Sequence, residues 1–150
     1  MKKNLGVKPV MFPMPVLIVA TYNEDGTANA MNAAWGGIHD TNQIGICIAP
    51  EHKTFENLVR TKAFTVSMAD ASHAAACDYV GIVSGNKVPD KFAKAGFHAT
   101  KSEFVDAPLI DELPIAMECT SDGWSLNNEL EPPPEACDIR CQKLMAACGS

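Results

Sequence analysis

The sequence lacks the short motifs that identify several large classes of enzyme. It has no G-x-G-x-x-G after a strand, no P-loop, no G-x-S-x-G elbow and no H-E-x-x-H pair. A Rossmann dinucleotide site and the common hydrolase and metalloprotease sites are therefore not indicated. If the chain is an enzyme, we expect a bound cofactor to carry its chemistry.

The chain also lacks a basic face and a long apolar run. Its formal net charge is −6 and its pI is about 5.1, which argues against nucleic-acid binding. No apolar segment approaches the roughly 18 residues of a membrane span. Residues 10–20 are apolar but are interrupted by Pro13 and Pro15 and end in no A-x-A-like cleavage site. We interpret them as an entry strand and predict a cytoplasmic protein.

The C-x2-C ladder of a zinc ribbon is missing, although the chain has six cysteines. Three stand alone in apolar segments and are expected to behave as small hydrophobes: Cys47, Cys77 and Cys119. Three crowd the C-terminal tail, where they form only a weak candidate for a metal site: Cys137, Cys141 and Cys148. We expect free thiols in an intracellular protein and name no metal ligand.

What the sequence does contain is the composition of one ordinary folded domain. Its 150 residues are 47% hydrophobic and 20% charged. More than half of residues 28–38 are Ala or Gly, and such small side chains let a backbone lie close to a flat ligand. The same composition also suits a strand packed in a tight core, and composition alone favours that second interpretation.

Apolar runs and turn residues predict an antiparallel, mostly β domain with short helices and no internal repeats. The predicted strands are 16–22, 28–35, 44–49, 64–68, 97–104 and 113–119. An Asp-Gly pair at 25–26 suits a hairpin between the first two strands. The predicted helices are 54–62, 72–79 and a short one over 89–94. After Thr120 this order is lost, and 137–148 is at best a short amphipathic helix.

The start of the helix over 54–62 has the composition of a phosphate site. His52, Lys53 and Thr54 place an imidazole, a cation and a hydroxyl beside the free N–H groups of a helix N-terminus. The alternative is a solvated loop with Thr54 as the N-cap residue. Taken alone, this segment favours the solvated loop.

Three segments, in this order, resemble the flavin reductase-like, FMN-binding split-barrel family and within it the flavoredoxin group. They are A-N-A-M-N-A-A-W at 28–35, A-P-E-H-K-T at 49–54 with Asn57 behind it, and S-G-N-K-V-P-D-K-F at 84–92. The resemblance covers residues about 10 to 120 and implies a split, Greek-key-like β-barrel over 1–120. Residues 121–150 do not match the family, so an altered tail would leave the barrel incomplete, with an open edge beside Met117.

The resemblance also implies a cofactor site for FMN. The strand at 29–35 would lie along the flavin ring, 49–54 would hold the ribityl chain and phosphate, and 84–92 would line the remaining side, from the same or the neighbouring subunit. The candidate cofactor-binding residues are Asn29, Ala30, Met31, Asn32, Ala33, Ala34, Trp35, Ala49, Pro50, His52, Lys53, Thr54, Asn57, Ser84, Gly85, Asp90, Lys91 and Phe92.

Three of these candidates have competing interpretations. We expect Trp35 to be a core aromatic rather than a ring that stacks on flavin. For Asp90 and Lys91, a solvated helix start is as good an interpretation as ligand contact. Of the four histidines, only His52 is a candidate for binding.

The resemblance implies a homodimer in which FMN accepts electrons from NADH, NADPH or a redox partner protein. Because the flavin ring does this chemistry, we name no catalytic residue. Two alternatives stay open: a flavin-binding electron carrier without nicotinamide activity, and an incomplete, non-enzymatic module that associates through its open edge and binds metal through the tail cysteines.

Overall fold

The fold is built around antiparallel strands. The structure, a computed structural model, describes residues 4, 6, 12–121 and 139–146. Its strands are β1 (Leu17–Tyr22), β2 (Ala28–Ala33), β3 (Gly36–Asp40), β4 (Gln43–Ile46), β5 (Ala63–Met68), β6 (Ala99–Lys101), β7 (Pro108–Ile110), β8 (Ile115–Ser121) and β9 (Ile139–Ala146). Its helices are α1 (Lys53–Thr61), α2 (Ala74–Ile82) and α3 (Lys91–Lys94).

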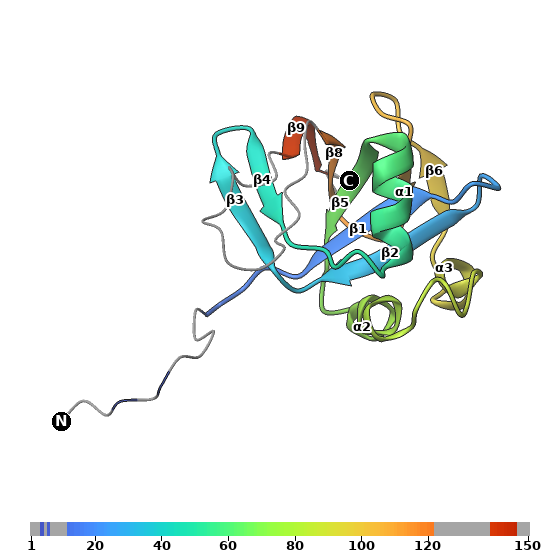
Figure 1. Cartoon of the computed structure of the whole chain (residues 1–150), viewed down its shortest axis with the longest axis horizontal. Coiled ribbons are helices and arrows are strands. Elements are labelled where there is room, and N and C mark those ends of the chain that lie inside the picture. The colour runs from blue at the N-terminus through green and yellow to red at the C-terminus, as the bar shows by residue number, and fades with distance from the viewer. Residues whose placement is uncertain (1–3, 5, 7–11, 122–138, 147–150) are drawn as a thin grey trace.

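Seven strands within the described residues form one curved sheet in the order β2-β1-β5-β8-β9-β4-β3, and β6 and β7 form a separate pair (Figure 1). Every strand pair is antiparallel, as the sequence predicts. β2 and β3 are the two ends of the large sheet, although they follow each other in the chain. The sheet is therefore a split barrel that does not close.

The hairpin of β1 and β2 is the part of the sheet that local sequence specifies most clearly. Gly26 adopts a positive φ of 81°, and the Asn23 N–H donates to the Thr27 carbonyl oxygen at 2.8 Å. This turn sets the register in which Val19 pairs with Met31. Since the side-chain period of a strand is two, the register also decides which residues of β2 face each side of the sheet.

The two faces of β1 contribute to two separate cores. Leu17 and Val19 pack with residues of β5, β8 and α1, while Ile18 and Ala20 pack with residues of α2 and α3. In the view of Figure 1, α1 lies above β1 and β2, and α2 and α3 lie below them. β1 is buried on both faces, as its continuous apolar run predicts. The edge strand β2 thus runs between α1 on one side and α2 on the other.

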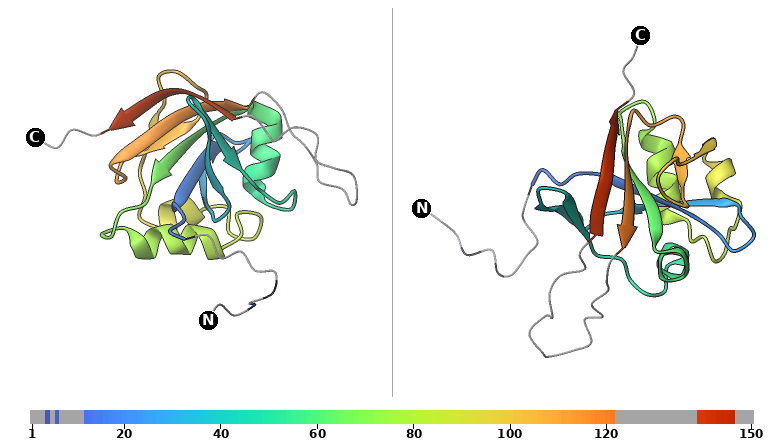
Figure 2. Two further views of the ribbon diagram at one scale, coloured as in Figure 1. Left: turned by 90° about the vertical axis from the view of Figure 1, so that its left-hand side faces the viewer. Right: turned by 90° about the horizontal axis from the view of Figure 1, so that it is seen from above.

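The tail departs from the sequence prediction. Residues 139–146 form a strand, β9, which pairs with β8 over Ile115 to Ser121 and with β4 at its other edge (Figure 2). The prediction of at best a short helix here is wrong, and so is the open edge beside Met117, because β9 covers it. Of the three cysteines that formed a weak candidate for a metal site, Cys141 lies in β9, and Cys137 and Cys148 lie outside the described residues.

Several other elements also differ from the sequence predictions. The sequence analysis missed β3 and β7, and α2 extends to Ile82 rather than ending at Tyr79. Cys77 and Cys119 are buried as predicted, whereas Cys47, just beyond β4, is exposed. Among the described residues, no helix has both the length and the apolar character needed to cross a bilayer.

Candidate functional site

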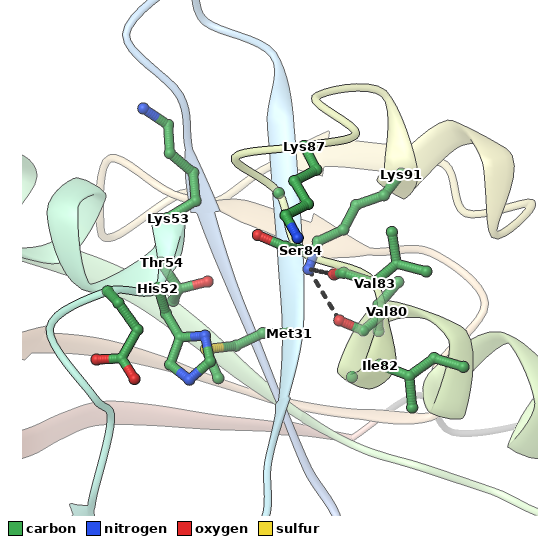
Figure 3. A pocket seen from close by; sticks show the side chains of 13 residues that line it. Met31, His52, Lys53, Thr54, Val80, Ile82, Val83, Ser84, Lys87 and Lys91 are labelled. Carbon is green, nitrogen blue, oxygen red and sulfur yellow. Dashed lines mark hydrogen bonds between the residues drawn. The ribbon is translucent and has the colours of Figure 1, made fainter.

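A pocket of about 260 Å³ lies where the N-terminus of α1 meets the C-terminus of α2 and the loop that follows it. Figure 3 shows its lining side chains, with Met31 reaching in from β2. The lining residues are Met31, Glu51, His52, Lys53, Thr54, Val80, Gly81, Ile82, Val83, Ser84, Gly85, Lys87 and Lys91. The structure therefore brings together parts of all three segments that carry the family resemblance.

The first turn of α1 presents unused hydrogen-bond donors to this pocket. His52 is the N-cap residue and makes no side-chain cap hydrogen bond. The amides of Phe55 and Glu56 donate to the His52 carbonyl oxygen, at 2.9 and 3.3 Å. No described backbone carbonyl accepts from the amides of Lys53 and Thr54, which precede them. Free amides and the helix dipole together favour an anion at this position.

Thr54 is not the N-cap residue that the sequence suggests but lies inside the first turn, almost fully buried. Its hydroxyl oxygen accepts a hydrogen bond from Asn29 Nδ2 at 2.9 Å. A hydroxyl that accepts in this way keeps its own O–H for another acceptor. Among the described residues no such acceptor is present, so Thr54 can donate into the pocket that it lines.

A buried amide and hydroxyl network supports this arrangement. Asn57 Nδ2 donates to the hydroxyl of Thr21 at 3.1 Å and to Asn23 Oδ1 at 2.9 Å. Asn29 Nδ2 also approaches the Thr21 hydroxyl, at 3.5 Å. The network ties β1, β2 and α1 together behind the pocket. Asn57, predicted as a cofactor ligand, lies in this network and not among the pocket-lining residues.

The cations at the pocket differ in what they bind. Lys53 Nζ pairs with Glu56 Oε1 at 2.7 Å, and Figure 3 shows its side chain extending away from Lys87 and Lys91. Lys87 extends toward Ser84 and Lys91 in the same view. Lys91 is 3% exposed, and its Nζ donates to the carbonyl oxygens of Val80 and Val83 at 2.8 and 2.9 Å. The interpretation of Lys91 as part of a solvated helix start is wrong.

Glycine allows the loop after α2 to lie against α1. A Cβ atom at Gly85 would stand 2.7 Å from Asn29 Oδ1 and 3.1 Å from Lys53 Cβ. Asn86 Nδ2 fastens the same loop by donating to the Glu51 carbonyl oxygen at 3.0 Å. Since the backbone approaches so closely, only glycine fits at position 85 without displacement of its neighbours.

β2 contributes to the site through the backbone groups of its edge rather than through its small side chains. Ala30 and Ala33 are buried in the two cores, as the core interpretation of this run predicts. Among the described residues, no strand pairs with the outer edge of β2. A ligand beside Met31 would find backbone N–H and C=O groups of that edge without strand partners.

The remaining predicted site residues do not line the pocket. Ala34, Trp35 and Pro50 are exposed, Ala49 and Asn32 are half-buried, and Phe92 packs in the core with Phe97. Asp90 forms an exposed ion pair with Lys94 at 3.0 Å. Trp35 is 54% exposed, so the prediction that it is a core aromatic is wrong.

The histidines lie in different surroundings. His73 and His98 pair with the neighbouring carboxylates of Asp70 and Glu112, whereas His52 lines the pocket.

Sequence reasoning missed several pocket residues. Lys87 lies within the third segment of the family resemblance, but one lysine in a loop carries no signal that would identify it as a ligand. The helix predicted over 72–79 stops short of the pocket, whereas α2 runs on to Ile82 and places Val80, Gly81 and Ile82, with Val83 after them, in the pocket lining. The hydrophobic character of α2 indicates burial and says nothing of which turn meets the pocket.

Comparison with known proteins agrees with this architecture. The flavin reductase like domain family matches residues 10–126. The structure is similar to flavoredoxin of Desulfovibrio vulgaris (Miyazaki F), with a TM-score of 0.84 and 31% identity, covering 97% of this chain and 76% of that one. It is also similar to flavoredoxin from Methanosarcina acetivorans, with a TM-score of 0.76 and 23% identity over 97% of this chain and 76% of that one.

A curated relative is longer than this chain. An uncharacterised protein of Aeropyrum pernix is 28% identical over 111 residues, which are 73% of this chain but 42% of that protein. This chain therefore spans less than half the length of the curated relative it matches. The family match covers most of the chain and supports a flavin-related redox function. The chain belongs to the flavin reductase-like, split-barrel family.

Proposed function

We propose that the chain is an FMN-binding oxidoreductase that passes electrons between NADH, NADPH or a redox partner protein and the flavin. The observation that carries the proposal is that the uncapped N-terminus of α1 opens into the same pocket as the edge strand β2. One end of this pocket suits a phosphate, and the other offers a bare backbone edge to a planar ring. Both features suit FMN, which carries a charged phosphate at one end and a planar isoalloxazine ring at the other.

The residues present fit the phosphate of FMN. The amides of Lys53 and Thr54, the Thr54 hydroxyl and the ammonium of Lys87 are donors around one small pocket. Charge-assisted hydrogen bonds of this kind are stronger than neutral ones. Glu51 is the one carboxylate residue among the lining residues, against three lysines. The balance of charge therefore favours an anionic ligand.

The chain's own part in the reaction is to bind and orient the cofactor. Bound FMN would supply the electron-accepting ring, and the backbone edge of β2 beside Met31 would hold the ring in place. The close packing of Gly85 against Asn29 and Lys53 would keep the two walls of the pocket at a fixed separation. No acid, base or nucleophile from the protein is required.

A homodimer is part of the proposal. Ile38, on the edge strand β3, is 89% exposed, and Trp35, just before that strand, is 54% exposed. Apolar side chains at an unpaired sheet edge favour burial against a second chain. A cytoplasmic location stays a prediction.

The visible spectrum of the freshly purified protein tests the proposal. We expect a flavin absorption band, or its appearance after FMN is added, and oxidation of NADH or NADPH faster than in a control with flavin alone. A protein that binds FMN without nicotinamide turnover would be the electron carrier of the second hypothesis. A protein that binds no flavin under any condition would contradict the proposal.

A further inference from the structure

A side chain joins the two walls of the pocket at the start of α1. Asn86, in the loop after α2, donates from Nδ2 to the carbonyl oxygen of Glu51 at 3.0 Å. The residues on either side of Asn86, Gly85 and Lys87, line the pocket together with Glu51, whereas the exposed Asn86 does not. This hydrogen bond therefore lies at the outer boundary of the pocket, and we call it the clasp.

The loop that carries the clasp lies tightly against α1. Gly85 is buried, and a Cβ atom there would stand 3.1 Å from Lys53 Cβ in the first turn of α1. The Ser84 carbonyl oxygen accepts from the Lys87 amide at 3.1 Å, so residues 84–87 form a turn. A tight turn packed in this way moves away from α1 only if the clasp opens.

The charges around the outer side of α1 are negative. Lys53 Nζ pairs with Glu56 Oε1 at 2.7 Å, and in Figure 3 its side chain extends away from the other two labelled lysines. Hydrogen bonds from Thr27, and to a smaller extent the nearby charge of Lys53, hold the pKa of Asp25 below its usual range. Asp25 and Glu56 therefore lie near the Lys53 ammonium, and Glu51 lies at the clasp. A ligand that extends past the start of α1 would meet carboxylates.

The group attached to its phosphate decides whether a flavin needs space at this boundary. FMN ends in a phosphate monoester, which is close to doubly charged at neutral pH because its second pKa is about 6. In FAD the same phosphate continues through a second phosphate into adenosine, so this ligand must pass the loop and bring a further negative charge toward Glu51.

We propose that the clasp of Asn86 and Glu51 is a specificity-determining contact that selects a flavin ending in a phosphate monoester over FAD. The closed loop leaves the start of α1 accessible to a terminal phosphate and obstructs a phosphate that carries a further group. Such a contact gives specificity by weakening the competitor rather than by strengthening the preferred ligand. This inference rests on the proposed function, since it needs a flavin phosphate at the start of α1.

Isothermal titration calorimetry of the flavin-free protein with FMN, FAD and riboflavin tests this selection. Riboflavin has the ring and the ribityl chain without a phosphate, so it reports what those parts contribute. We expect wild type to bind FMN about tenfold or more tightly than FAD, and FAD no more tightly than riboflavin. An FAD phosphate that reached the start of α1 would instead make FAD bind more tightly than riboflavin.

Replacing Asn86 isolates the effect of the clasp. Asn86→Ala removes one hydrogen bond, so the preference for FMN over FAD should fall about five- to tenfold, chiefly through tighter binding of FAD. Asn86→Asp also removes the donor but adds a negative charge, so its gain in FAD affinity should be smaller. Asn42→Ala, in the exposed turn between β3 and β4, is the matched control and should leave the preference unchanged. Melting temperatures check that each variant is folded.

Equal affinities of wild-type protein for FMN and FAD would overturn this inference whether or not the variants fold. An Asn86→Ala protein whose preference for FMN is unchanged would overturn it too, because another part of the site would then make the selection. In both cases the bound flavin would leave the proposed function standing. A wild-type protein that binds none of the three flavins would overturn the proposed function and this inference together.

Discussion

Asn29 Nδ2 lies 2.9 Å from the hydroxyl oxygen of Thr54, in a contact that joins the edge strand β2 to the first turn of α1. Both side chains are almost fully buried. An amide donor in this place requires the Thr54 hydroxyl to accept, and so leaves its O–H to the pocket. Asn29 is thus a positioning residue for the phosphate end of the site.

Replacing Asn29 with Asp tests that role with little change of shape. The carboxylate would accept the Thr54 O–H and withdraw it from the pocket, so FMN affinity should fall about tenfold or more while riboflavin affinity changes less. Flavin titrations followed by fluorescence quenching measure both constants. In a Thr54→Val background the added effect of Asn29→Asp should shrink, and full additivity of the two changes would mean that Asn29 does not act through Thr54.

Gly85→Ala should destabilise the protein by about 1 to 3 kcal/mol, because the new methyl group would meet Asn29 Oδ1 at 2.7 Å. Gly37→Ala is the matched control, since nothing lies within 4 Å of a Cβ there, and its effect should stay within about 0.5 kcal/mol. Urea denaturation gives both values. Equal stabilities of the two variants would show that the loop does not depend on close approach.

Glu56→Gln should increase the affinity for FMN by a few-fold. Glu56 Oε1 forms an ion pair with Lys53 Nζ at 2.7 Å, and this carboxylate places a negative charge near the anion site. Its removal frees the ammonium to turn toward a phosphate, although an exposed ion pair stabilises its partner only weakly. Glu103→Gln, an exposed change outside the pocket lining, is the control. A decrease in FMN affinity for Glu56→Gln would contradict this interpretation.

The pair of His98 and Glu112 should make stability depend on pH. The hydrogen bond to Glu112 raises the pKa of His98 above its usual 6.5. Burial alone would raise the pKa of Glu112, but hydrogen bonds from the His98 side chain and backbone outweigh it and lower that pKa below 4.5.

The signs of the two shifts define a pH window. The contribution of His98 is present below pH 6.5 and is lost as pH rises through its raised pKa. That of Glu112 is present above pH 4.5 and is lost as pH falls through its lowered pKa. The difference in melting temperature between wild type and His98→Gln should therefore be largest near pH 5.5 and should shrink toward pH 8. A constant difference would rule out this pair as the cause.

Local sequence was sufficient for much of the fold. The apolar run of β1 and the Asp-Gly turn before β2 specify a hairpin in a few residues, and the structure has it. β3 and β9 were missed for physical reasons. Gly36 and Gly37 at the start of β3 have low strand propensity, and β9 depends on pairing with β8 and β4 across a long separation in sequence.

The site was predictable in outline and not in detail. The composition of residues 52–54 suits an anion but taken alone favours a solvated loop, and only the structure places Lys53 and Thr54 in the lining of a pocket. Which donors are free depends on side-chain contacts that composition does not reveal: Asn29 Nδ2 donates to the Thr54 hydroxyl, Glu56 pairs with Lys53, and Lys91 Nζ donates to the end of α2. Trp35 shows the same limit, since its apolar character indicated burial while its place beside an edge strand leaves it exposed.

The central claim is that one pocket binds the phosphate of FMN at the start of α1 and the flavin ring at β2. Titration of the flavin-free protein with FMN and with riboflavin, each with wild type and with Thr54→Val, tests it most directly. The account predicts that wild type binds FMN at least tenfold more tightly than riboflavin and that Thr54→Val removes most of this difference. Equal affinities of wild-type protein for FMN and riboflavin would contradict it.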